Sequence, residues 1–313
     1  MIEVVLPTFN GVLYLEDQID SIWRQTLRPN RLIINDDCST DGTQNLIYKM
    51  SRKYGSWISY QFSEVRLGLT QNINILLARC TENYIAFADQ DDVWLPSKLE
   101  RSYSLMNQLE HHNGINTPLL VYSDLQLIDA DGISLGTTYY RNEAINPHQS
   151  SVEILTHTNV VVGCTMLINR DLLIKAYPIP CESTMHDHWL AIVGSFFGRI
   201  HFLDYATVKY RQHSANTIGS SGSNRFLYWS KKLIQFFLEY SSIKSLKVQI
   251  RQAEYFKTRY GHAISRIPFF SNLNFWMKLV FLFKNLVSNK LPYKHNALRT
   301  LAFYLGLLTL RRD

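Results

Sequence analysis

The stretch YIAFADQDDVW, residues 84–94, joins a run of apolar residues to three closely spaced aspartates. Tyr84–Ala88 is short and apolar, which is typical of a buried strand. Asp89, Asp91 and Asp92 follow it, and carboxylates this close repel one another unless a cation neutralises them. Mg²⁺ and Mn²⁺ prefer oxygen ligands and commonly bind one or two carboxylates together with substrate phosphates. The stretch therefore predicts a metal site at the end of a strand, with a solvated acidic turn that caps the next helix as the alternative.

Apolar runs and helical patterns alternate on both sides of this stretch. Short apolar runs predict strands at Ile2–Leu6, Arg31–Asn35, Ile58–Phe62, Leu119–Ser123 and Val160–Asn169, and a bent strand pair at Ile200–Tyr210. Helical spacing predicts helices at 13–26, 69–79, Leu95–His112 and His186–Phe197, and one that ends at Tyr48 and is capped by Ser39 or Thr40. Such alternation predicts an α/β fold with a largely parallel sheet and helices on both of its faces.

Polar residues follow three of the predicted strands at their carboxyl ends. Thr8–Asn10 follows the first strand, Asp36–Asp37 ends the second, and Asp89–Asp92 follows the fourth. Open sheets of this kind bind their ligands beyond the carboxyl ends of the strands. We therefore expect these three segments to form one site.

The overall composition excludes several classes of protein. The chain has 313 residues, of which 46% are hydrophobic and 19% charged, so it is neither disordered nor collagen-like. Its four cysteines are far apart and form no C-x-x-C pair, which disfavours a zinc site and a disulfide scaffold and favours a reducing, cytoplasmic location. The first residues lack the basic and apolar segments of a secretory signal, so none is expected.

Charge is distributed unevenly along the chain. Residues 225–313 hold 16 basic and three acidic residues, whereas residues 1–224 have an excess of acids. Helices are predicted at 225–260, 272–289 and 296–310, after a flexible joint at Gly219–Ser223. We therefore divide the chain into an α/β domain, 1–220, which is expected to carry the site, and a basic, aromatic helical region, 225–313. That region either lies on a membrane surface as a peripheral amphipathic anchor or packs on the first domain or a second subunit.

Taken together, the motifs resemble glycosyltransferase family 2, inverting enzymes with the GT-A fold. The pieces that carry the resemblance are Val5–Asn10, Asn35–Thr43, Arg66–Gly68 with Asn72, Asp89–Trp94, Gly163–Thr165, His186–Trp189 and Tyr210–Asn216. They occur in the family's order and cover about residues 1–220. The resemblance implies a Rossmann-like mixed sheet with a C-terminal helical extension. The version of the motifs found here is most similar to bacterial rhamnosyltransferases of surface-polysaccharide synthesis.

The resemblance implies a role for each matching residue. On the donor side it places Pro7, Thr8, Phe9, Asp37, Arg66, Asp89 and Arg211 at the nucleotide. Asp37 would accept the N3 hydrogen of uracil or thymine, which suits a carboxylate because it offers only acceptors. The ligands implied for Mn²⁺ or Mg²⁺ are Asp91, Asp89 and His213, with Asp91 the direct one.

On the acceptor side the resemblance implies Asp187 as the catalytic base. The residues that it places near the acceptor are Gly163, Cys164, Thr165, His188 and Trp189. A zinc site built from His186, His188 and His213 is not expected, because the first two flank Asp187 and point to different faces of a helix.

The expected reaction is a single displacement with inversion at the anomeric carbon. The expected donor is a dTDP- or UDP-linked sugar, with rhamnose favoured, and the expected acceptor is a saccharide or a lipid-linked saccharide. The expected location is the cytoplasm or the inner face of the cell membrane, and a homo-oligomer is left open. Two alternatives remain at this point: a metal-dependent nucleotidyltransferase and a non-catalytic nucleotide-sugar binding protein. A nucleic-acid partner is not expected, because no recognition fold is evident.

Overall fold

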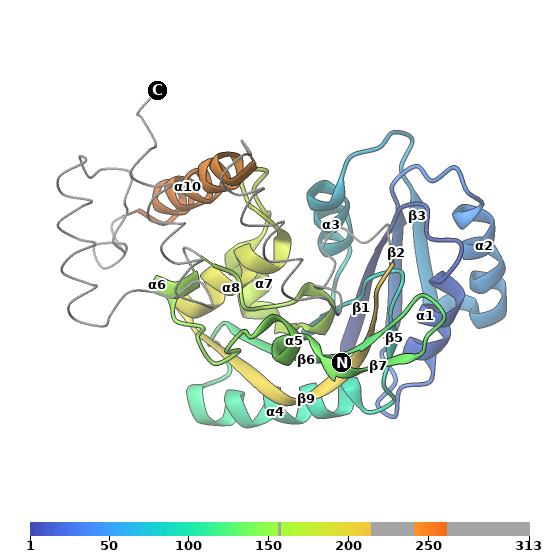
Figure 1. Ribbon diagram of the computed structural model, residues 1–313, viewed down its shortest axis with the longest axis horizontal. Helices are drawn as coiled ribbons and strands as arrows, with labels where there is room; N and C mark the ends of the chain where they lie inside the picture. Colours follow the sequence, from blue (N-terminus) through green and yellow to red (C-terminus); the bar gives the residue numbers. More distant parts are fainter. Residues whose placement is uncertain (156–157, 214–240, 262–313) are drawn as a thin grey trace.

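A computed structural model describes residues 1–155, 158–213 and 241–261. Its strands are Ile2–Thr8 (β1), Arg31–Asp36 (β2), Ile58–Phe62 (β3), Tyr84–Phe87 (β4), Val93–Trp94 (β5), Leu119–Ile128 (β6), Ser134–Thr138 (β7), Leu167–Asn169 (β8) and Arg199–Arg211 (β9). Within the described residues they form one sheet in the order β3-β2-β1-β4-β8-β6-β9-β5, with β7 paired to β6 (Figure 1). The pairs among β1, β2, β3 and β4 are parallel, as is β6 with β9, whereas β5, β7 and β8 run antiparallel to their neighbours. The predicted mixed, mainly parallel sheet is therefore confirmed.

Helices cover both faces of this sheet. The α-helices are Leu15–Trp23 (α1), Thr43–Tyr54 (α2), Leu69–Ala78 (α3), Lys98–Asn113 (α4), Tyr139–Glu143 (α5), Val152–Leu155 (α6), Arg170–Ala176 (α7), His186–Phe197 (α8) and Ser241–Tyr260 (α10), and the 3-10 turns are Gly55–Trp57 (η1) and Gly163–Thr165 (η2). Successive side chains of a strand point to opposite faces. Val4 accordingly lies in a buried cluster with Ile19 of α1 and Met106 of α4, whereas Val5 lies in a second cluster with Leu190 of α8.

The helix predicted to be capped by Ser39 or Thr40 begins later, at Thr43, and ends at Tyr54. Gly42 precedes it with φ +98°, a left-handed conformation that glycine adopts without strain. Ser39 Oγ instead donates to the Asp36 carboxylate. Thr40 N donates to Asn10 Oδ1 at 2.9 Å. The predicted cap was therefore wrong, and both residues fix the loop after β2.

The predicted strand Val160–Asn169 is shorter than expected. Only its last three residues form a strand, because the chain turns at η2. Thr165 Oγ1 donates to the carbonyl oxygen of Val162 at 2.7 Å, a local bond that competes with sheet pairing. The predicted strand pair Ile200–Tyr210 is likewise one strand, β9, whose register against β6 shifts on either side of Asp124.

Part of the basic C-terminal region packs on the helices that cover the sheet. Helix α10 falls within the predicted helix 225–260, and Figure 1 shows it beside α7 and α8. Phe256 of α10 is 1% exposed and belongs to the same buried cluster as Leu190. The predicted joint Gly219–Ser223, the domain boundary and the helices at 272–289 and 296–310 lie outside the described residues, so they stay predictions.

None of the helices in the described part of the chain has the length and apolar character needed to cross a bilayer.

Candidate active site

Two polar strand ends meet at one edge of the sheet. Thr8 of β1 is in register with Asp36 of the parallel strand β2, and Thr8 Oγ1 donates to Asp36 Oδ2 at 3.0 Å. Gln44 Nε2 donates to the other carboxylate oxygen of Asp36 at 2.8 Å. Asp36 therefore holds the loop together, and Pro7 and Thr8 are buried beside it.

The predicted donor-side residues lie on the neighbouring loops. The buried Asp37 carboxylate accepts the backbone N–H groups of Leu67 and Gly68 at 2.7 and 2.8 Å. The Arg66 guanidinium lies over the Phe9 ring, 3.9 Å from its centroid, in a cation–π contact. The structure therefore brings Phe9, Asp37 and Arg66 together at the end of β1.

Gln90, which sequence analysis did not single out, links this loop to the acidic stretch. Its Oε1 accepts the N–H of Phe9 at 2.9 Å, and its Nε2 donates to the carbonyl oxygen of Phe9 at 3.0 Å. A Cβ on Gly11 would lie 2.4 Å from Gln90 Oε1, so the contact requires glycine there. The only sequence signal for this link was the position of Gln90 between the aspartates.

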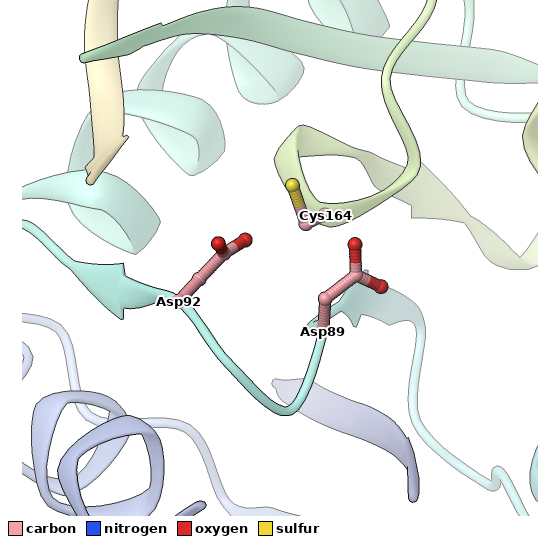
Figure 2. Close-up of side chains that lie close together, drawn as sticks. All are labelled: Asp89, Asp92 and Cys164. Carbon is pink, nitrogen blue, oxygen red and sulfur yellow. The ribbon is translucent and has the colours of Figure 1, made fainter. Parts of the chain in front are cut away.

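Asp89, Asp92 and Cys164 form an inner cluster. One ligand atom of each lies within 4.8 Å of the others, and Figure 2 shows the three side by side, the aspartates on the loop after β4 and the cysteine on η2. Burial, with the charges of Asp89 and Asp91, raises the pKa of Asp92 well above its usual range. Burial also raises the pKa of the Cys164 thiol, so it stays protonated. A neutral thiol is a poor ligand for Mg²⁺ or Mn²⁺, and this cluster does not fit such an ion.

A buried lysine, also missed by sequence analysis, lies beside this cluster. Lys98, at the start of α4, is 1% exposed, and its Nζ donates to the carbonyl oxygen of Thr165 at 3.1 Å. Its ammonium also lies 4.6 Å from the centroid of the Trp94 ring. Burial lowers the pKa of Lys98 to about 8, which leaves it mostly charged at pH 7. The inner carboxylates therefore already have a positive charge near them.

Asp91 and His213 form an outer pair that is easier to reach. His213 Nε2 lies 2.9 Å from Asp91 Oδ2, and the two side chains are 15% and 19% exposed. This is an ordinary hydrogen-bonding distance, and a carboxylate oxygen is a ligand that Mg²⁺ and Mn²⁺ prefer. Two of the ligands predicted from the resemblance, Asp91 and His213, therefore lie together, and their role as metal ligands stays a prediction.

Asp187 lies in the first turn of α8 and faces η2. Its Oδ2 accepts the N–H of Gly163 at 3.1 Å, and its Oδ1 accepts its neighbour His188 N at 2.5 Å. Burial raises the pKa of Asp187 to about 7, against the lowering effect of these hydrogen bonds. Burial, with the charges of Asp91 and Asp187, also raises the pKa of Asp89 to about 7. The negative charge of Asp187 therefore acts on Asp89 and contributes to its raised pKa.

The ring of His186, the residue before Asp187, is buried next to Gly163 of η2. It stacks on Phe87 with ring centroids 5.6 Å apart, and burial lowers its pKa to about 4, so it is neutral. A Cβ on Gly163 would lie 2.9 Å from His186 Nε2. Glycine at this position therefore lets η2 approach α8 closely enough for the bond to Asp187.

Two residues predicted for the acceptor side do not reach the site. Trp189 is fully buried, and its Nε1 donates to the carbonyl oxygen of Ala176 at 2.9 Å. His188 is also buried and contacts the carbonyl oxygen of Leu155. Neighbouring residues of a helix point in directions about 100° apart, so Asp187 faces η2 while His188 and Trp189 face the core. Their placement at the acceptor is corrected to a packing role.

Arg211 lies directly beside the acidic stretch. The side chain is buried, and its Nε donates to the carbonyl oxygen of Asp91 at 2.9 Å. Its Nη1 donates to the carbonyl oxygen of Ala130 at 2.8 Å, and its Nη2 lies 3.7 Å from Asp17 Oδ2. Arg211 therefore supports the backbone of Asp91, and its predicted approach to the diphosphate or the metal stays a prediction.

The chain was compared with known families and proteins. The family model described as Glycosyl transferase family 2 matches residues 3–175. An uncharacterised glycosyltransferase of Rickettsia prowazekii is 27% identical over 227 residues, which are 71% of this chain and 67% of that protein. The putative teichuronic acid biosynthesis glycosyltransferase TuaG of Bacillus subtilis is 27% identical over 172 residues, which are 55% of this chain and 63% of TuaG.

Two solved structures share the fold. S. aureus TarS in complex with UDP-GlcNAc superposes with a TM-score of 0.55 at 16% identity, covering 98% of this chain and 90% of that one. A mannosyltransferase of Pyrobaculum calidifontis in complex with GDP-Man and Mn²⁺ superposes with a TM-score of 0.52 at 12% identity, covering 98% of this chain and 84% of that one. At these identities the likeness establishes the GT-A type of fold.

Proposed function

The chain belongs to glycosyl transferase family 2 and is a glycosyltransferase, and from this premise we propose that it transfers a sugar with inversion from a nucleoside diphosphate donor, with Asp187 as the base. One observation carries the proposal. The turn η2 donates the N–H of Gly163 to Asp187, and its next residue, Cys164, adjoins Asp89 of the acidic stretch. The proposed base and Asp89 of the donor side thus both adjoin the same turn.

In the proposed reaction Asp187 accepts the proton of an acceptor hydroxyl. The hydroxyl oxygen forms a bond to the anomeric carbon while the bond from that carbon to the diphosphate oxygen breaks on the opposite face. The configuration therefore inverts, and the nucleoside diphosphate leaves with the bonding electrons. The two N–H groups that hold Asp187 orient its carboxylate, and base assistance of this kind typically contributes about 10²–10⁴-fold to the rate.

Asp91 and His213, with Asp89, would hold the divalent cation. The carboxylate oxygens of Asp91 and Asp89 suit Mg²⁺ or Mn²⁺ in chemistry, His213 lies beside Asp91, and the fold relative from Pyrobaculum calidifontis was solved with Mn²⁺. When bound, such an ion stabilises negative charge on a departing diphosphate. Arg211 supports this site indirectly, because it fixes the backbone of Asp91.

For the donor we propose a UDP- or dTDP-linked sugar, with rhamnose as the first candidate. The nucleotide would lie on Pro7, Thr8 and Phe9, with Arg66 beside it and Asp37 at the base. TarS, a fold relative, was solved with UDP-GlcNAc, which supports a uridine nucleotide, and the resemblance of the motifs supports rhamnose. Because Asp37 already accepts two backbone N–H groups, a base N–H would have to use the remaining lone pairs of its oxygens.

For the acceptor we propose a saccharide or lipid-linked saccharide in the synthesis of a bacterial surface polysaccharide. TuaG, named for teichuronic acid biosynthesis, supports this class. Gly163, Cys164 and Thr165 line the acceptor side in this proposal, next to the base. The reaction would take place in the cytoplasm or at the inner face of the membrane.

A donor panel tests the proposed function. UDP-, dTDP- and GDP-linked sugars are added to the protein with Mn²⁺ or Mg²⁺, and thermal unfolding is recorded. A ligand that binds only the folded state raises its apparent stability. We expect the largest rise in Tm with a uridine or thymidine donor, and release of the nucleoside diphosphate once an acceptor saccharide is added. Release of pyrophosphate would instead support nucleotidyl transfer, which the family assignment disfavours.

Transfer is expected to increase with pH. Burial raises the pKa of Asp187 to about 7, and only its ionised form accepts a proton. Below that pKa, kcat/KM should rise about tenfold per pH unit, and above it the curve should level off. A cation near Asp89 and Asp91 favours the ionised carboxylates, so the midpoint with saturating metal should lie at or below about 7. A flat profile between about pH 5 and 9 would contradict a base of this kind.

A further inference from the structure

Helix α10 is fixed to the helix that carries Asp187. The ring of Phe256 on α10 lies 5.7 Å, centroid to centroid, from the ring of Trp189 on α8. The Tyr260 hydroxyl donates to the carbonyl oxygen of Lys175 on α7 at 2.7 Å. These contacts hold α10 in place without touching the carboxylate.

One side chain of α10 contacts the chain on both sides of Asp187. Gln252 is 1% exposed, and its Oε1 accepts the N–H of Thr184 at 2.6 Å. Its Nε2 lies 3.4 Å from Nδ1 of His188. Thr184 comes three residues before Asp187 and His188 directly after it, so a single amide spans the segment that contains the base.

The contact with Gln252 also fixes the tautomer of His188. An amide nitrogen only donates, so His188 Nδ1 accepts and its proton lies on Nε2. Nε2 then donates to the carbonyl oxygen of Leu155. The backbone N–H of His188 donates in turn to Asp187 Oδ1. His188 therefore links α10 to the carboxylate: its ring accepts from Gln252, and its backbone N–H donates to Asp187.

We propose that Gln252 is a positioning residue for the reaction: it holds Thr184 and His188 so that the Asp187 carboxylate keeps its direction toward the acceptor. This inference rests on the proposed function, in which Asp187 is the base. It also makes α10, part of the basic C-terminal region, a component of the catalytic unit. An amide suits the position because it must accept one hydrogen bond and donate another.

The variant Gln252→Met tests this role, because it keeps the length of the side chain and removes both hydrogen bonds. We expect kcat to fall about 10- to 100-fold, since small displacements of a catalytic group have effects of that size. Donor KM and the donor-induced rise in Tm should stay unchanged, because the proposed donor contacts come from other loops. The acid limb of the pH profile should move to higher pH, because the His188 N–H that lowers the pKa of Asp187 is displaced.

A conservative variant provides the rescue. Gln252→Glu still accepts the Thr184 N–H, and it can accept from His188 Nδ1 once that atom carries a proton. We therefore expect a kcat between those of the wild type and Gln252→Met. If Gln252→Met does not fold, Gln252→Glu decides alone: kcat and a pH profile equal to the wild type would overturn the inference.

Tyr260→Phe is the matched control, because it removes another hydrogen bond that holds α10, away from the base. It should lower Tm but leave kcat and the pH profile unchanged. If it reduces kcat as much as Gln252→Met, or if Gln252→Met turns over normally while Asp187→Asn is inactive, the positioning role is wrong and the proposed function stands. If Asp187→Asn is itself active, the proposed function fails first.

Discussion

Asp187→Asn is expected to bind the nucleotide sugar as the wild type does and to lose transfer. The asparagine has the shape of aspartate and can still accept one backbone N–H, but it cannot take a proton from the acceptor. We expect kcat to fall about 10²–10⁴-fold, the usual contribution of a general base. The measurement is release of nucleoside diphosphate in the presence of acceptor, with the donor-induced rise in Tm recorded on the same sample.

The control is Asp171→Asn, another aspartate in the first turn of a helix. It removes the same charge from a similar position on α7, outside the proposed site. We expect normal turnover from this variant. Near-normal turnover by Asp187→Asn, with its fold intact, would mean that another group takes the proton and would remove Asp187 from the mechanism.

The sequence was sufficient to predict most strands of the sheet, because their signals lie in the residues themselves, but β5 and β7 were not predicted. Ile2–Leu6 and Arg31–Asn35 are apolar runs that end in polar residues, and both became parallel strands with their carboxyl ends together. The prediction failed at η2, where a threonine hydroxyl and a glycine turned the chain away from the expected strand. Such local hydrogen bonds compete with sheet pairing, and the apolar pattern of a sequence does not reveal them.

The positions of Asp37 and Asp89 at strand ends were predictable from the sequence, whereas their roles come from the resemblance and stay predictions. Site residues were not predictable where tertiary contacts decide the role. His188 lies directly after the proposed base in sequence, but the helix turns its side chain away into the core. Lys98 is a charged residue in a helix, normally a sign of exposure, and only the fold buries it beside the acidic cluster. Gln252 is distant in sequence, and no pattern in α10 distinguishes it.

The inner cluster and the outer pair differ in the positive charge that lies near their carboxylates. The inner group, Asp89 and Asp92 with the Cys164 thiol, has the buried ammonium of Lys98 nearby. The outer pair, Asp91 and His213, is partly exposed, and its two side chains are hydrogen-bonded to each other. The resemblance implies Asp91 as the direct ligand of the ion. We therefore expect metal dependence to follow Asp91.

Asp91→Ala is accordingly expected to remove metal dependence. The remaining His213 imidazole and Asp89 carboxylate should bind Mg²⁺ or Mn²⁺ more weakly, because one of the oxygen ligands that these ions prefer is lost. Loss of several kcal/mol of charge stabilisation on the leaving diphosphate corresponds to about a 10³-fold lower kcat/KM. The rise in Tm caused by Mn²⁺ with a nucleoside diphosphate should also disappear, a measurement that does not depend on turnover.

Asp17→Ala is the matched control for the loss of one negative charge near Arg211. Asp17 is 68% exposed and lies 3.7 Å from the Arg211 guanidinium, whereas Arg211 Nε contacts the backbone of Asp91. This variant should keep both activity and the metal-induced rise in Tm, since exposed ion pairs contribute little. Equal losses in Asp17→Ala and Asp91→Ala would indicate a general electrostatic effect. Full activity of the wild type after removal of divalent ions with a chelator would reject the metal site, because transfer would then proceed without the ion.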